Sequence, residues 1–128
     1  MPDLLQMVVN LRMPMTALAF DDTLVSVTST TETEVKYFRF SIFPQSKYTY
    51  CFVRVSLYTE GGTGILSIYI DNETTARKTF STNVTTENVF EDYFYIGDLS
   101  SGIHTFRVKL SNSEGYKTYN KLLEVFAR

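Results

Sequence analysis

Hydrophobic and polar residues alternate along most of the chain with the two-residue period of a half-buried β-strand. In one long example, His104, Phe106, Val108 and Leu110 fall at every second position. The alternating segments are separated by turn residues and recur about every 10 to 14 residues, which is typical of an antiparallel sandwich or barrel. We expect strands at residues 24–28, 35–43, 48–58, 65–71, 76–82, 89–96, 102–112 and 117–126. The pattern predicts an all-β fold: an antiparallel two-sheet β-sandwich, jelly-roll or immunoglobulin-like, with seven to eight strands.

The first 23 residues do not follow this alternation, and their apolar spacing fits either a short helix or an extended arm. Asp3, Arg12 and Pro14 interrupt the apolar residues, so we expect neither a secretion signal nor a membrane span. We therefore divide the chain into an apolar N-terminal arm or interface segment (1–23) and a sandwich domain (24–128). The arm residues expected to contact a protein partner are Leu4, Leu5, Val8, Val9, Leu11 and Met13.

The composition agrees with a single globular β domain. The chain has 128 residues, enough to bury one core, and its ten Phe and nine Tyr favour strands. The formal net charge is −2, and the Lys and Arg residues are scattered singly along the sequence. Because nucleic-acid binding needs a basic patch, we expect no nucleic-acid partner.

Candidate catalytic residues are few. His104 is the only histidine and Cys51 the only cysteine, and each falls in phase with the apolar residues of its strand. Cys51 is therefore expected to be a buried thiol, and no serine lies in a G-x-S-x-G motif. Acidic clusters such as Glu91-Asp92 do not have the spacing of a calcium-binding EF-hand loop. We expect a protein that is not an enzyme and that holds no metal or other cofactor.

The outward sides of two expected strands are unusually aromatic. Tyr48, Tyr50 and Phe52 share one side of their strand, and Tyr93 and Tyr95 share one side of theirs. Since the outside of a sandwich is normally polar, either something covers this area or one strand has its opposite face inward. The cover would be the N-terminal arm, a neighbouring subunit, or a sugar stacked on the tyrosines. The candidate surface-binding residues are Tyr48, Tyr50, Tyr93, Tyr95 and, on the next strand, Arg107.

The run IGDLSSGIHTFRVKLSNSEGY (96–116) resembles the late hairpin of jelly-roll and immunoglobulin-like sandwiches, including carbohydrate-binding modules. In such modules the run follows a strand similar to ILSIYIDN (65–72). The resemblance covers Ile65–Phe126 and implies that His104 is a strand residue at the end of a sheet and not a catalyst. A small sandwich with an apolar arm is also similar to the decoration (cement) proteins of tailed-virus capsids, which implies oligomers that bind a protein shell through the arm.

These resemblances lead to two main hypotheses. The first, which we rank higher, is a virion structural protein of the capsid decoration type: a homo-oligomer that binds a capsid or other virion protein. The alternative is a carbohydrate-binding module, or an adhesin or tail-tip domain, whose tyrosines stack on a glycan while Arg107 bonds the hydroxyls. The absence of Trp weighs against this alternative. A third interpretation is an oligomeric scaffold. The first hypothesis locates the protein in the virion; the others locate it in the cytoplasm or at the cell surface.

Overall fold

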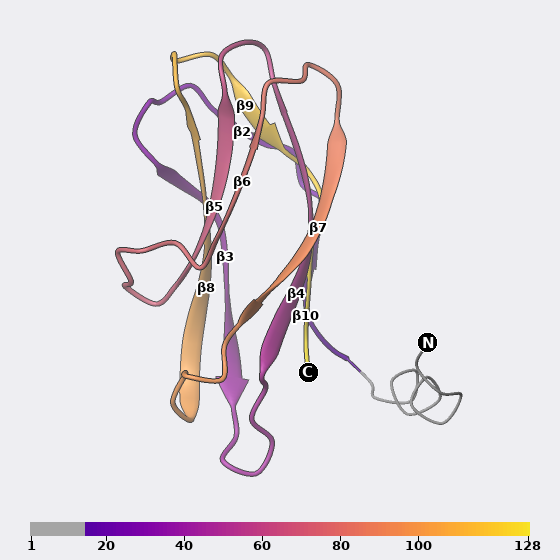
Figure 1. Ribbon diagram of the computed structural model, residues 1–128, viewed down its shortest axis with the longest axis vertical. Coiled ribbons are helices and arrows are strands. Elements are labelled where there is room, and N and C mark those ends of the chain that lie inside the picture. Colours follow the sequence, from indigo (N-terminus) through magenta and orange to yellow (C-terminus); the bar gives the residue numbers. More distant parts are fainter. Residues whose placement is uncertain (1–14) are drawn as a thin grey trace, which may run out of the picture.

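A computed structural model describes residues 15–128, which form two antiparallel β-sheets packed face to face (Figure 1). Ten strands and no helix occur among the described residues. The predicted all-β two-sheet sandwich is confirmed, although the number of strands is higher than seven or eight. The strands are β1 (Thr16–Asp21), β2 (Val25–Val27), β3 (Thr33–Ile42), β4 (Tyr50–Thr59), β5 (Gly64–Ile70), β6 (Lys78–Thr82), β7 (Asn88–Tyr95), β8 (Gly102–Asn112), β9 (Thr118–Asn120) and β10 (Leu123–Ala127).

One sheet has six strands and the other has four. The six-stranded sheet runs β1–β10–β4–β9–β2, with β7 pairing β4 as well, and the four-stranded sheet runs β3–β8–β5–β6. Figure 1 shows β4, β7 and β10 in one layer and β3, β5 and β8 in the other. Many of the neighbouring strands are far apart in the sequence. Their register is set by burial, because a slip of one residue would turn every core side chain toward solvent.

Among the described residues, the first strand, β1, begins at Thr16, inside the segment predicted to be an arm. Strand β1 pairs with β10, with a bulge between Ala17 and Ala19, and Leu18 packs against the core. The last residues of the segment 1–23 therefore belong to the sheet. The predicted partner-binding residues of the arm lie outside the described residues, and their role stays a prediction; they are Leu4, Leu5, Val8, Val9, Leu11 and Met13.

The last predicted strand, 117–126, is divided into β9 and β10. Both pieces pair with β4: β9 pairs with the last two residues of β4, Tyr58 and Thr59, and β10 pairs with Cys51–Val55. Between them, the backbone N–H groups of Lys121 and Leu122 donate to the buried Ser56 hydroxyl at 3.0 and 2.8 Å. This side-chain oxygen replaces the regular ladder, so the strand breaks where the buried serine supplies an alternative acceptor.

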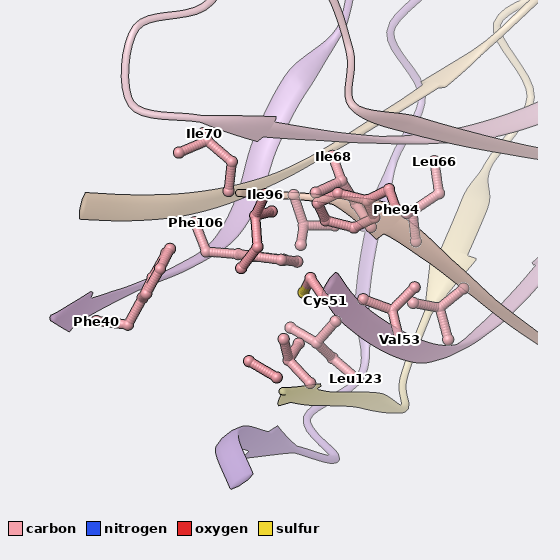
Figure 2. Packing of buried hydrophobic residues seen from close by; sticks show 14 of the residues in the cluster. Phe40, Cys51, Val53, Leu66, Ile68, Ile70, Phe94, Ile96, Phe106 and Leu123 are labelled. Carbon is pink, nitrogen blue, oxygen red and sulfur yellow. The ribbon is translucent and has the colours of Figure 1, made fainter. Parts of the chain in front are cut away.

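The hydrophobic core lies between the two sheets and is built from alternate residues of both. Phe106 is fully buried; its ring stacks on Phe38 with centroids 4.7 Å apart and lies 6.4 Å from Phe94. Figure 2 shows Phe94 and Cys51 of the six-stranded sheet facing Ile68 and Phe106 of the four-stranded sheet. Full burial of each large apolar side chain contributes about 1.5–3 kcal/mol, so this layer dominates the stability of the fold.

Lys36 is an unpredicted charged residue inside the sandwich. It lies on β3, an edge strand, and is 6% exposed. Its ammonium donates to the Lys121 carbonyl at 2.6 Å and lies 3.6 Å from an Asp21 carboxylate oxygen. Asp21 ends β1 of the opposite sheet, and Lys121 lies between strands β9 and β10 of that sheet. Burial lowers the pKa of Lys36, although the Asp21 charge acts in the opposite direction. An inward-pointing charge of this kind also protects an edge strand from pairing with another chain.

Candidate functional site

The outward side of the six-stranded sheet carries a continuous group of aromatic side chains. On β4 and β7, Tyr50 lies opposite Tyr95 and Phe52 lies opposite Tyr93. Because alternate residues of a strand share a side, all four side chains point away from the core. The rings of Tyr93 and Tyr95 approach Tyr50 edge-on, with centroids 5.6 and 6.0 Å apart. Tyr50, Tyr93 and Tyr95 are 39%, 56% and 54% exposed. Three of the predicted surface tyrosines are therefore gathered on one face.

Strand β10 extends this group with a residue that was not among the predicted ones. Phe126 pairs with Phe52 across β10 and β4, and Phe52 in turn packs against Tyr93 with centroids 5.7 Å apart. The Arg128 guanidinium lies 5.0 Å from the centre of the Phe52 ring. The alternation of Leu123, Val125 and Ala127 inward already indicates that Phe126 points outward. We call this surface, made of Tyr50, Phe52, Tyr93, Tyr95 and Phe126, the aromatic face.

A hollow of about 460 Å³ opens on the aromatic face. Its apolar lining includes Met15, Phe52, Tyr93 and Phe126, and Arg54 and Glu91 are among its polar residues. A concave surface with an apolar floor and a few polar groups at its edge is the usual form of a small-ligand site. This hollow is therefore the candidate functional site.

A row of charged residues crosses the face beside the aromatic group. The Arg54 guanidinium donates to a Glu91 carboxylate oxygen at 2.7 Å and lies 3.5 Å from a Glu124 carboxylate oxygen. Asp92 lies on the inner side of β7, opposite Val53, where Lys78 of the other sheet pairs with it and holds the pKa of its carboxyl below the ordinary value. The Glu91 and Glu124 carboxylates can accept hydrogen bonds from a polar ligand above the rings, and the Arg54 guanidinium can donate them.

Two of the predicted surface residues do not join the aromatic face. Tyr48 is half-buried and packs against the core in the loop before β4. Arg107 lies on β8 of the other sheet, where its guanidinium donates to the Asp71 carbonyl and to a Glu34 carboxylate oxygen, both at 2.8 Å. A single sequence does not tell to which of the two sheets a strand belongs, so Arg107 and the tyrosines could not be separated by their pattern.

The outward side of the four-stranded sheet has a different character. Arg107 lies between Tyr37 and Tyr69 in the register, and Lys109 lies beside Ser67. Its charges are largely engaged, because Arg107 pairs with Glu34 and the Lys109 ammonium lies 4.5 Å above the centre of the Tyr69 ring. This mixed polar surface is what solvent-facing sheets normally present. The aromatic enrichment is thus a property of the other sheet.

His104 lies on β8 in phase with the core residues, as its position in the sequence predicts. It is 7% exposed, and its Nδ1 lies 2.7 Å from an Asp71 carboxylate oxygen while its Nε2 lies 2.7 Å from the Ser100 carbonyl. Both neighbours are acceptors, so the ring can make both hydrogen bonds only when both of its nitrogens carry a proton, that is, as an imidazolium. Burial alone lowers the pKa of His104, but the hydrogen bonds to Asp71 and Ser100 and the Asp71 charge outweigh it and raise the pKa. His104 thereby ties the end of β8 to two loops.

The thiol of Cys51 is not placed for nucleophilic chemistry. It is 1% exposed on the inner side of β4, and burial raises its pKa to about 12. A thiol with this pKa is protonated at neutral pH, and the thiolate is the nucleophilic form. Within residues 15–128, no group of three or more His, Cys, Asp or Glu side chains could hold a metal ion. None of the described residues belongs to a helix long and apolar enough to cross a membrane.

No protein-family model matches this sequence, and no curated protein does either. Solved structures do match its fold. A carbohydrate-binding module, CBM4, aligns with a TM-score of 0.57 and 9% identity over 89% of this chain and 78% of its own. The C-terminal domain of EclA, a sugar-binding protein, aligns with a TM-score of 0.55 and 11% identity over 81% of this chain and 77% of its own.

A third similar structure is the insecticidal delta-endotoxin Cry8Ea1 from Bacillus thuringiensis. It aligns with a TM-score of 0.54 and 15% identity over 82% of this chain, which corresponds to 19% of the toxin. At these identities the three similarities show the fold alone: this chain has the β-sandwich found in carbohydrate-binding modules. The similarity to such modules that the hairpin at 96–116 indicates is therefore confirmed at the level of the fold.

Proposed function

We propose that this protein is a non-enzymatic carbohydrate-binding module that binds a glycan on the aromatic face. The observation that carries the proposal is one face that combines exposed Tyr50, Tyr93 and Tyr95 with a hollow whose lining includes Phe52, Tyr93 and Phe126 together with Arg54 and Glu91. A sugar ring has an apolar C–H surface and a rim of hydroxyl groups. Aromatic rings bury such a surface, while Arg54 and Glu91 at the rim supply the hydrogen-bond partners of the hydroxyls.

Two of the similar structures are described as a carbohydrate-binding module and a sugar-binding protein, which supports the proposal. A shared fold does not imply a shared function, so the argument depends on the chemistry of the face. The absence of Trp does not oppose it, because Tyr and Phe side chains provide the same kind of flat surface.

The capsid decoration hypothesis has less support. It depends on the arm residues before Met15, which lie outside the described residues, and the three structures compared above do not include a capsid protein. The first hypothesis therefore gives way to its alternative. A protein partner or a second copy of this chain would be a competing occupant of the same face, and the experiment below distinguishes it.

The test compares Tyr93→Ala with Tyr37→Ala on a glycan array and by titration calorimetry. Both tyrosines are well exposed, at 56% and 67%, but Tyr37 lies on the four-stranded sheet. Loss of a tyrosine anchor at a binding site costs about 1.4 kcal/mol or more, so Tyr93→Ala should weaken glycan binding about tenfold. Tyr37→Ala should bind as the wild type does.

Two results would contradict the proposal. One is equal glycan affinity for Tyr93→Ala and the wild type. The other is a wild-type protein that binds no glycan and forms oligomers in sedimentation experiments, with the Tyr93→Ala variant monomeric. That pattern would assign the aromatic face to contact between copies of the chain.

A further inference from the structure

A second hollow lies toward the other end of the same sheet. Its volume is about 380 Å³, and its lining includes Tyr58, Glu60, Thr85 and Tyr119. Tyr58 is six residues from Phe52 on β4 and therefore shares its side of the strand. At about 3.3 Å per residue, the two positions are about 20 Å apart along the strand.

The two tyrosines of this hollow form a flat aromatic pair. Tyr58 and Tyr119 are register partners across β4 and β9, and their rings stack with centroids 4.5 Å apart and planes within 9° of each other. The Tyr119 hydroxyl donates to the Glu60 carboxylate, a hydrogen bond that raises the pKa of Tyr119. The hollow thus combines an aromatic surface with a carboxylate that can accept hydrogen bonds from hydroxyl groups.

A buried hydrogen-bond network holds this pair in place. The Asn112 amide group donates to the Thr59 hydroxyl at 2.9 Å, to the Gly61 carbonyl at 2.9 Å and to the Thr118 hydroxyl at 3.1 Å. Thr59 and Thr118 are the chain neighbours of Tyr58 and Tyr119, and both are fully buried. Ring positions fixed from below by satisfied polar groups are typical of a binding surface that is organised before the ligand arrives.

The two hollows are separate positions on one face. Between them lies Ser56, which is fully buried where the backbone of Lys121 and Leu122 bonds to its hydroxyl. The Arg54–Glu91 pair borders the first hollow on this side. Because the two hollows are about 20 Å apart, a ligand that contacts both must be an extended chain.

We propose that the Tyr58–Tyr119 hollow is a second glycan-binding position, so that the ligand is a linear polysaccharide bound along its length over both hollows. This inference rests on the proposed function. Two linked contacts raise the overall affinity by 10²–10⁴-fold over either one when the ligand can span them. The ligand class that follows is a polymer, not a mono- or disaccharide.

The experiment measures the affinities of wild type, Tyr119→Ala, Tyr93→Ala and Tyr37→Ala for linear neutral oligosaccharides. The probes are glucose, xylose, mannose and galactose series, each as the dimer and the hexamer. For the series that binds, Tyr119→Ala should lower hexamer affinity at least tenfold and leave dimer binding at the first hollow unchanged, whereas Tyr93→Ala should lower both. Thermal melting checks that each variant is folded. If Tyr119→Ala does not fold, Tyr58→Ala replaces it, because this substitution disrupts the same aromatic pair.

Wild-type hexamer affinity in both Tyr119→Ala and Tyr58→Ala, together with a loss in Tyr93→Ala, would overturn the second position and leave the proposed function standing. Equal wild-type affinity for dimer and hexamer would overturn it as well. A wild-type protein that binds none of the probes would instead contradict the proposed function, and the second position with it.

Discussion

Replacing His104 by Ala should destabilise the protein in a way that depends on pH. The imidazolium donates to the Asp71 carboxylate and to the Ser100 carbonyl, both at 2.7 Å, and only the protonated ring can make both bonds. The first bond reaches the loop after β5, and the second reaches the loop between β7 and β8. His104→Ala removes both hydrogen bonds, so that the Asp71 carboxylate and the Ser100 carbonyl must accept hydrogen bonds from water instead.

The size of the effect follows from the partners. A hydrogen bond to a charged group contributes about 1.5–3 kcal/mol. The Asp71 side chain is 43% exposed, so water partly replaces its bond, and Asp71 keeps a backbone donor, Thr105 N–H at 2.8 Å. We therefore expect His104→Ala to lower the free energy of unfolding by about 2–4 kcal/mol when the ring of the wild type is protonated.

The pH dependence has a definite sign. The folded-state pKa of His104 is raised above its unfolded value of about 6.5, so its stabilising contribution is fully present below that pH. The contribution falls as the pH rises through the folded-state pKa, because the neutral ring can donate only one of the two bonds. The difference between wild type and His104→Ala should then shrink by about 1–2 kcal/mol.

Urea unfolding followed by circular dichroism, at pH values from 5.5 to 9.5, measures this difference directly. Ile103→Ala is a suitable control because Ile103 precedes His104 on β8 but is 65% exposed and does not titrate. Its difference from wild type should be independent of pH. A difference for His104→Ala that is constant over this range, or that grows with pH, would refute the doubly donating imidazolium.

Two further predictions concern the core and the N-terminal boundary. Cys51 is buried with a pKa raised to about 12, so the native protein should not react with a disulfide reagent at pH 8, whereas the urea-unfolded protein should react quickly; rapid native labelling would contradict the burial. Deletion through Thr23 removes β1 and leaves the edge of β10 unpaired, so it should melt at a lower temperature than deletion through Pro14, which retains β1. The partly buried Leu18 side chain of β1 alone contributes at most about 3 kcal/mol to the free energy of unfolding. Equal melting temperatures of the two truncations would show that β1 does not contribute to stability.

The sequence by itself determined the class of fold and most of the strands. Each of the eight predicted strands is present, because the alternation of apolar and polar residues reports directly which side of a strand is buried. The same alternation placed His104 on the inward side of its strand with Phe106, and Tyr50 on the outward side, opposite to that of Cys51. The structure agrees on both. These are local properties, since a two-residue period is readable without knowing the neighbouring strand.

Only the tertiary structure decided which strands are neighbours. The aromatic face exists because β7 and β10 both pair with β4, which brings Tyr93 and Phe126 beside Phe52 from positions far apart in the chain. Arg107 has the same outward pattern as the tyrosines, but its strand pairs into the opposite sheet. The pairing of distant strands depends on how both sheets bury their apolar sides together. A binding surface made of residues from several strands therefore cannot be predicted before that pairing is known.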